Sequence, residues 1–218
     1  MSTVTDNLKE MELLWNSINV FLIIIDSSGS MQSYAKEMEK RLKEFSRRMS
    51  LMDEAGSVII SRVDFEDSYS QTKYDRVENF KTSYYANGGT ELYKAIYETL
   101  PTLIGSENEE GAVQILQDQG YEPKFTIVVF SDGEDNNGKR SRYREKAKKM
   151  VERVNEMHGV TAFVSFGGDI SRNVAEDLGF KNIDSKYDLE QAFEAITSSC
   201  IRQSQSDVSL TDTFFDNN

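Results

Sequence analysis

The sequence contains very little cysteine, histidine and proline. Cys200 is the only cysteine and His158 the only histidine, so one chain can form neither a disulfide nor a Cys/His zinc site. Only two of the 218 residues are proline, and no Pro-, Gly- or Ser-rich segment divides the chain, which predicts one domain. No apolar run approaches the ~20 residues that span a bilayer, and the N-terminus has no signal-peptide core. We therefore expect a cytoplasmic protein.

Net positive charge is also lacking, since 37 Asp and Glu residues outnumber 25 Lys and Arg residues and give a formal net charge of −12. Nucleic acids and anionic membranes are polyanions, so this charge disfavours both as partners. The acidity itself has two interpretations, solubility and cation binding, and the composition does not choose between them.

The chain is rich in short apolar runs that alternate with helical patterns. Val20–Ile25 and Phe125–Phe130 are unbroken runs of aliphatic and aromatic residues, typical of strands buried on both faces. Residues 35–52 carry apolar side chains at three- and four-residue steps, which predicts a helix with one buried stripe. This alternation predicts an α/β fold with three layers, in which helices cover both faces of a doubly wound, mostly parallel sheet.

The weaker sequence patterns predict the elements at the edge of the domain and the segments at its two ends. Residues 69–80 alternate loosely and predict one antiparallel edge strand, and Pro101 is expected to kink or end the helix that begins near Thr90. Residues 104–122 are expected to be a surface excursion with one helical turn. We predict an N-terminal helical extension over residues 1–17, a central domain over 18–204 and a loose, polar and acidic tail over 205–218.

Three polar loops are expected to meet at one edge of the sheet. Asp26–Ser30 (DSSGS) follows the first buried strand, Ser131–Asp135 follows the second, and Gly88–Thr90 opens a helix. Ligands of such sheets bind beyond the carboxyl ends of the strands, where the strand order reverses. Asp26 and Asp132 would meet there if their strands are neighbours. Carboxylate and hydroxyl oxygen atoms suit Mg²⁺ or Mn²⁺.

Each of these residues also has a purely structural interpretation. Ser28, Ser30 and Thr90 could cap the helices that follow them, and Asp132 with Gly133 could form an ordinary turn. Together, two acidic loops after two buried strands favour a metal site.

Other acidic residues near these loops are interpreted as structural. Glu134 and Asp135 could support the metal ligands, but a solvated turn is favoured for them. Asp64, Glu66 and Asp67 could line the metal face, but a polar hairpin is favoured. The loop after Asp132 superficially matches a calcium-binding loop, but its glycine spacing excludes an EF-hand.

The three loops, in this order, resemble the metal-ion-dependent adhesion site of von Willebrand factor A domains. The resemblance covers residues 18–204 and implies that family's fold. It implies a site that usually holds Mg²⁺, with Mn²⁺ and Ca²⁺ as alternatives. The implied ligands, direct or through water, are Asp26, Ser28, Ser30, Thr90 and Asp132.

In that family an acidic side chain of the ligand completes the metal shell, which implies an intracellular protein-interaction module rather than an enzyme. The alternative is a metal-dependent hydrolase of phosphate esters. Ile196–Ser206 (ITSSCIRQSQS) further resembles the stand-alone bacterial tellurium-resistance-type members. That resemblance implies kinase, phosphatase or ATPase partners in a stress-response or defence assembly.

Overall fold

The structure is a computed structural model of the chain that describes residues 3–13, 16–52, 57–132, 135–136, 141–166, 170–186, 188–206 and 210–215. Its strands are β1 (Ser17–Asp26), β2 (Val58–Phe65), β3 (Tyr69–Gln71), β4 (Asp75–Arg76), β5 (Glu122–Ser131), β6 (Val160–Phe166) and β7 (Asn182–Lys186). Its α-helices are α1 (Ala35–Met52), α2 (Leu92–Ile104), α3 (Ala112–Asp118), α4 (Arg144–Glu156), α5 (Ile170–Leu178) and α6 (Leu189–Gln205). Three 3₁₀ helices are η1 (Asp6–Glu10), η2 (Gly29–Tyr34) and η3 (Val77–Asn79).

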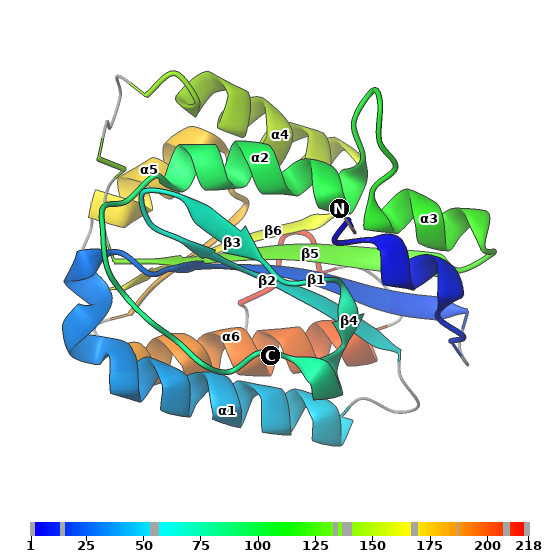
Figure 1. Ribbon diagram of the computed structural model, residues 1–218, viewed down its shortest axis with the longest axis horizontal. Helices are drawn as coiled ribbons and strands as arrows, with labels where there is room; N and C mark the ends of the chain where they lie inside the picture. Colours follow the sequence, from blue (N-terminus) through cyan, green and yellow to red (C-terminus); the bar gives the residue numbers. More distant parts are fainter. Residues whose placement is uncertain are drawn as a thin grey trace.

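These elements form the three layers predicted from the sequence (Figure 1). The strand order is β3-β2-β1-β5-β6-β7, with β4 also paired to β2. The pairs among β2, β1, β5, β6 and β7 are parallel, whereas β3 and β4 run antiparallel to β2. The fold class is therefore confirmed, and the predicted edge strand is split into two short strands.

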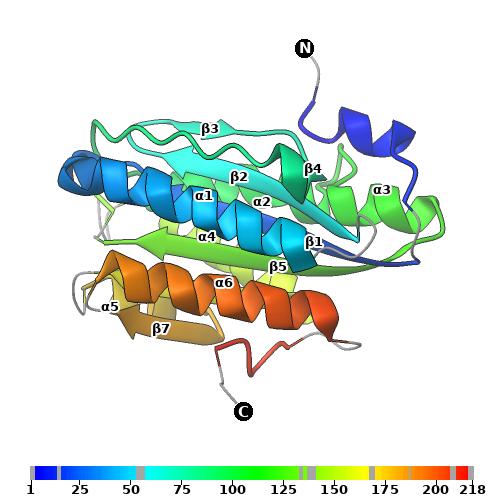
Figure 2. The same ribbon diagram turned by 90° about the horizontal axis from the view of Figure 1, so that it is seen from below.

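One apolar cluster fills each side of the sheet. The cluster on the α2 side contains Ile24, Ile96 and Val151, and the cluster on the α1 side contains Ile25, Leu42 and Ile196. Figure 2 shows α1 and α6 side by side across the second face. Because β1 has helices over both faces, its side chains on each face are buried, which explains its unbroken apolar run.

The structure corrects part of two expectations for the middle of the chain, since Pro101 does not end its helix and the segment after it contains more helix than predicted. Helix α2 continues through Pro101 to Ile104, because Leu103 and Ile104 are fully buried in the core and favour one more helical turn. The helical turn expected within residues 104–122 is confirmed, but it is the longer helix α3 (Ala112–Asp118), and it packs into the core with Val113 and Leu116 fully buried. Burial of these apolar side chains outweighs the weak local pattern.

The ends of the described chain also pack more closely than expected. Leu8 of η1 is fully buried, and among the described residues the predicted N-terminal helical extension is this one 3₁₀ helix of 5 residues. The tail is not loose over residues 210–215, because Phe214 is fully buried beside α6. The side chain of Asn182 accepts from the Phe214 N–H (2.9 Å) and donates to the Thr211 carbonyl (2.8 Å).

None of the helices among the described residues is long and apolar enough to cross a membrane.

Candidate metal site

The sheet reverses its strand order between β1 and β5, and the candidate site lies at the carboxyl ends of these two strands. Strand β1 pairs with β2 on one side and with β5 on the other. Ile25 of β1 is opposite Phe130 of β5, so Asp26 and Ser131 follow side by side. The Ser131 hydroxyl donates to Asp26 Oδ2 at 2.6 Å. The predicted meeting of the two acidic loops is therefore observed.

Four of the five predicted ligands are joined by direct hydrogen bonds. Asp26 Oδ1 accepts from the Ser28 N–H (2.9 Å), and the hydroxyl oxygen atoms of Ser28 and Ser30 lie 2.9 Å apart. The Ser30 hydroxyl donates to Asp132 Oδ1 at 3.0 Å. The side chains of Asp26 and Ser28 are buried, whereas Asp132 is half-buried, so the cluster faces solvent on the Asp132 side.

Thr90 is held near the other four residues by backbone hydrogen bonds of its loop. Its carbonyl accepts from the Asn136 N–H (2.8 Å), which fixes the Thr90 loop against the segment that follows Asp132. The Gly29 N–H donates to the Gly88 carbonyl (3.0 Å), which fixes the same loop against the Asp26–Ser30 segment. No contact described in the structure joins the Thr90 hydroxyl to the other four side chains. All three loops are nevertheless held at one place.

Glycine is needed where these loops touch. Gly88 has φ +72°, a left-handed conformation that favours glycine. A Cβ atom on Gly89 would lie 2.0 Å from Asn136 Nδ2 and 2.4 Å from Asp67 Oδ1. A side chain at Gly89 would therefore force the side chains of Asn136 and Asp67 to move.

The capping interpretations do not fit the structure. Ser28 is the N-cap residue of η2, but its side chain accepts no cap hydrogen bond. Helix α2 begins after Glu91 rather than after Thr90, and the Tyr93 N–H donates to Asp135 Oδ2 at 3.1 Å. The hydroxyl groups of Ser28 and Thr90 are thus not used as caps.

Some neighbouring acidic residues have roles that the sequence did not predict. Asp135 is buried and binds the N-terminus of α2 instead of lying in a solvated turn, while Glu134 lies outside the described residues. Asp64 lies within β2 and pairs with the buried Arg62. Glu66 and Asp67 do form a turn, since the Glu66 N–H donates to the Ser68 carbonyl.

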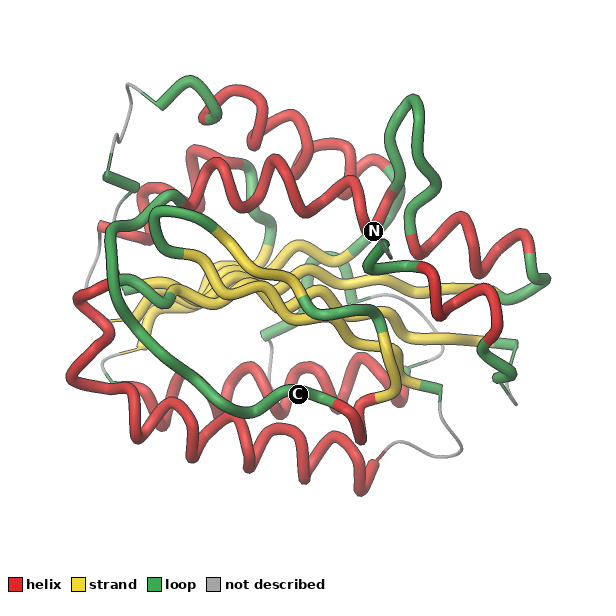
Figure 3. Tube along the Cα trace, viewed as in Figure 1, coloured by secondary structure: helices red, strands yellow, loops and turns green. Residues whose placement is uncertain are grey.

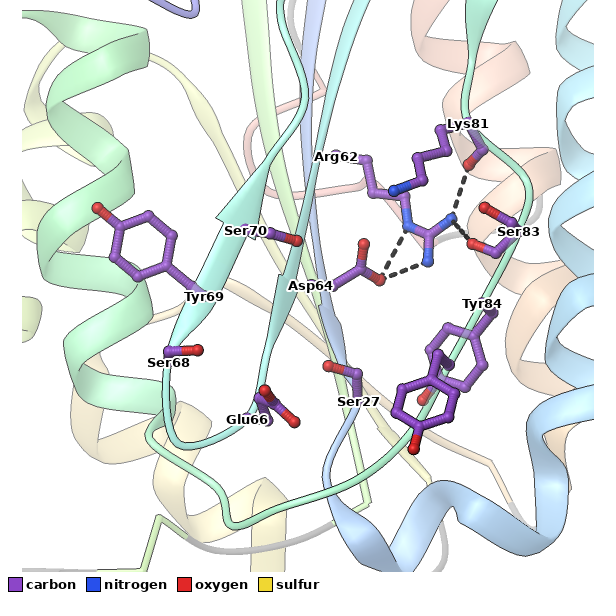
Figure 4. A pocket seen from close by; sticks show the side chains of 11 residues that line it. Ser27, Arg62, Asp64, Glu66, Ser68, Tyr69, Ser70, Lys81, Ser83 and Tyr84 are labelled. Atoms are coloured by element: carbon purple, nitrogen blue, oxygen red, sulfur yellow. Dashed lines mark hydrogen bonds and ion pairs between the residues drawn. The ribbon is translucent and has the colours of Figure 1, made fainter.

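A pocket of about 280 Å³ opens beside the Asp26–Ser30 loop. Figure 4 shows Arg62 and Asp64 of β2 on one wall and Tyr84 on the other, with Ser27 of the candidate metal loop between them. Tyr84 donates its hydroxyl to the Asp26 carbonyl at 2.5 Å. Burial raises the pKa of Tyr84, and the nearby charges of Asp26 and Asp64 raise it further, so this hydroxyl stays a donor.

Both carboxyl groups of the site have raised pKa values. Burial raises the pKa of Asp26 above its ordinary 3.8, although hydrogen bonds from Ser131 and Ser28 oppose the rise. Burial also raises the pKa of Asp132, against a hydrogen bond from Ser30. In the metal-free protein, burial therefore disfavours the ionised form of both carboxyl groups.

The stability of the metal-free protein should consequently fall as the pH rises from about 3.8 through these raised pKa values. In that pH window the folded chain binds more protons than the unfolded chain. The stability that this proton binding contributes below pH 3.8 is therefore lost as the pH rises. Denaturant unfolding in EDTA at several pH values measures the effect. Asp26→Asn removes one titration, so its stability relative to the wild type should increase with pH; a pH-independent difference would contradict the assignment.

The donor set fits a small hard cation. Nowhere in the described part of the chain do three or more His, Cys, Asp or Glu side chains come together so as to hold a metal ion. The candidate site has only two carboxylates, so metal binding would depend on hydroxyl oxygen atoms as well. In an octahedron with Mg–O distances of roughly 2.0–2.1 Å, adjacent oxygen atoms are about 2.8–3.0 Å apart. The Ser28–Ser30 and Ser30–Asp132 oxygen distances of 2.9 and 3.0 Å have this spacing.

The sequence matches no protein-family model, and it matches no curated relative. Solved structures are similar in fold. They include the pilus adhesin SpaC from Lactobacillus rhamnosus GG in its open conformation, with a TM-score of 0.63, 10% identity, and coverage of 88% of this chain and 30% of the adhesin.

Two further similar structures carry the von Willebrand name. A von Willebrand factor type A protein from Catenulispora acidiphila has a TM-score of 0.56 and 16% identity over 85% of this chain and 43% of its own. The ArnB paralog VWA2 from Sulfolobus acidocaldarius has a TM-score of 0.51 and 18% identity over 86% of this chain and 45% of its own. The chain thus has a von Willebrand factor A-like fold, and it spans less than half the length of these three proteins.

Proposed function

We propose that this chain is a protein-interaction module that holds Mg²⁺ at the three loops and binds an acidic side chain of a partner through it. The observation that carries the proposal is the convergence of the Ser28, Ser30 and Asp132 oxygen atoms, which lie 2.9 and 3.0 Å apart in one hydrogen-bonded chain and are close enough to bind a single ion. Mn²⁺ and Ca²⁺ are alternative ions.

The five side chains would have different roles. Ser28 and Ser30 would bind the ion directly through their hydroxyl groups. Both oxygen atoms of Asp26 already accept hydrogen bonds and its side chain is fully buried, so Asp26 would act mainly through water. Asp132 is more exposed and would act directly or through water, and Thr90 would complete the set from its own loop.

The small number of carboxylates is what makes the site suitable for a partner. The two carboxylates together carry just enough negative charge to balance a divalent ion. One of them, Asp26, is fully buried behind the hydroxyl groups. When bound, the ion would supply a Lewis-acid position for a carboxylate from another protein. Tyr85, which is 75% exposed beside the same loops, offers an aromatic contact of the kind enriched at protein interfaces.

We further propose a cytoplasmic setting in a multi-protein stress-response or defence assembly, with kinase, phosphatase or ATPase partners. This part rests on the resemblance of Ile196–Ser206 to tellurium-resistance-type proteins. The net charge of −12 supports a protein partner over nucleic acid or an anionic membrane. No catalytic role is assigned to the site, so hydrolysis of phosphate esters is the less favoured function.

The open position can be tested with Mn²⁺ as the ion and short peptides as probes. Bound Mn²⁺ enhances the relaxation of water protons while water occupies its open position. Acetyl-Gly-Glu-Gly-amide at millimolar concentration should lower this enhancement, because its carboxylate replaces water, whereas acetyl-Gly-Gln-Gly-amide should not. Equal effects of the two peptides would show that the site does not select a carboxylate.

A further inference from the structure

A long extended segment connects η3 to α2 and passes the candidate metal loops. Residues 81–87 of this segment, called the strap below, contain no helix or strand (Figure 3). The strap makes two hydrogen bonds to the metal loop. Tyr84 donates its hydroxyl to the Asp26 carbonyl at 2.5 Å, and the Asn87 N–H donates to the Ser27 carbonyl at 2.8 Å.

The strap is itself held by a buried arginine. Arg62 has a side-chain exposure of 1% although it lies in the middle of β2. One nitrogen atom of its guanidinium donates to the carbonyl groups of Lys81 (2.7 Å) and Ser83 (2.9 Å), and its Nε donates to Asp64 Oδ1 (3.0 Å). Figure 4 shows the bonds from Arg62 to the carbonyl groups of Lys81 and Ser83 in the strap, and those to Asp64 within β2.

Arg62 also fixes the ring that follows. Its Cζ atom lies 5.8 Å from the centroid of the Tyr84 ring, within the range of a cation–π contact. The planar guanidinium thus holds two carbonyl groups of the strap and one face of Tyr84 at once, which a lysine side chain could not do. These contacts leave the Tyr84 hydroxyl directed at the end of β1.

We propose that Tyr84, held by Arg62, is a positioning residue for the metal loop. Its hydroxyl fixes the Asp26 carbonyl at the point where β1 ends and the loop begins. The loop is short, and four of its next backbone N–H groups have their own partners: Phe65 for Ser27, Asp26 for Ser28, Gly88 for Gly29 and Ser28 for Met31. A loop fixed in this way presents the Ser28 and Ser30 hydroxyl groups at ligand spacing before any ion is bound. This inference rests on the proposed metal site and assigns its preorganisation to the strap.

The decisive variant is Tyr84→Phe, which removes one oxygen atom. By calorimetry, the variant should bind Mg²⁺ about 10-fold more weakly than the wild type, as is typical when a group that supports metal ligands is lost. In EDTA, hydrogen exchange of the backbone amides in residues 27–31 should be faster. Arg62→Lys should show both effects, because it retains the charge but loses the planar fork.

Tyr74→Phe is the matched control. Tyr74 is fully buried, and its hydroxyl forms a hydrogen bond with Thr102 on α2, away from the metal loops. This variant should change neither Mg²⁺ affinity nor exchange in residues 27–31, even if it lowers stability. Wild-type Mg²⁺ affinity in Tyr84→Phe, or equal exchange in residues 27–31, would overturn the positioning role. If the wild type bound no Mg²⁺, the proposed function would fail, and the exchange measurement alone would then decide the role of Tyr84.

Discussion

Asp132→Ala is expected to weaken Mg²⁺ binding by at least about 100-fold, which in a calorimetric titration means loss of measurable heat. Asp132 is the more exposed of the two carboxylates and accepts a hydrogen bond from Ser30, one of the proposed direct ligands. Loss of groups that only support metal ligands typically costs 10–100-fold, so loss of a carboxylate of the set should cost more.

The same variant separates metal binding from folding. Burial raises the pKa of Asp132, so the ionised group does not stabilise the metal-free fold. In EDTA the thermal midpoint of Asp132→Ala should therefore not fall, whereas the rise that Mg²⁺ gives the wild type should be absent. Asp118→Ala removes an exposed carboxylate at the end of α3 and should behave as the wild type. Wild-type affinity in Asp132→Ala would remove Asp132 from the site.

Phe214→Ala is expected to lower the free energy of unfolding by about 3–5 kcal/mol. The Phe214 side chain is fully buried in the cluster that contains Phe193, Ile196 and Cys200 of α6. Its removal would leave a cavity between α6 and the end of the sheet. Denaturant unfolding followed by circular dichroism measures the loss.

Phe215→Ala is the control for this change. The ring of Phe215 lies 5.0 Å from that of Phe214 but is only half-buried, so its loss should cost clearly less. If both variants were as stable as the wild type, residues 210–215 would be the loose tail that composition alone predicted, and the packing described here would be wrong.

The sequence was sufficient to predict the type of sheet, and it predicted the meeting of the loops on the condition that their strands are neighbours, which the strand order meets. The apolar runs before Asp26 and Asp132 are long enough that only strands buried on both faces explain them. Once the two strands are neighbours with a reversal of order between them, the polar residues that end them must lie together. Periodicity thus predicted which loops end the two buried strands, and the resemblance to von Willebrand factor A domains implied which of their residues would bind a metal.

The contacts that hold the loops were not predictable in the same way. Asp135 binds the N–H of Tyr93, 42 residues earlier, and Arg62 binds the carbonyl of Ser83, 21 residues later. Arg62 lies within an apolar strand, where a charged side chain is expected to face solvent. Its side chain is nevertheless buried. Pairings over such separations depend on the path of the whole chain, and no local pattern encodes them.

The tail shows that average composition can also predict disorder where the chain packs. Ser204–Asn218 is polar and acidic, and composition therefore predicted disorder. One aromatic residue and one asparagine decide the outcome for the part that is described, because Phe214 fills the core and Asn182 holds the Phe214 N–H and the Thr211 carbonyl. A single buried ring is too small a feature to stand out in average composition.

The most direct test of the central claim is a crystal structure of the protein grown with Mn²⁺, with data collected at the manganese absorption edge. The account predicts one anomalous peak within bonding distance of the Ser28 and Ser30 hydroxyl groups. Asp26, Thr90 and Asp132 should contact the ion directly or through one water, and one coordination position should hold water or a carboxylate from a neighbouring molecule. A peak at other residues, or none at saturating Mn²⁺, would contradict the claim that the three loops form one open metal site.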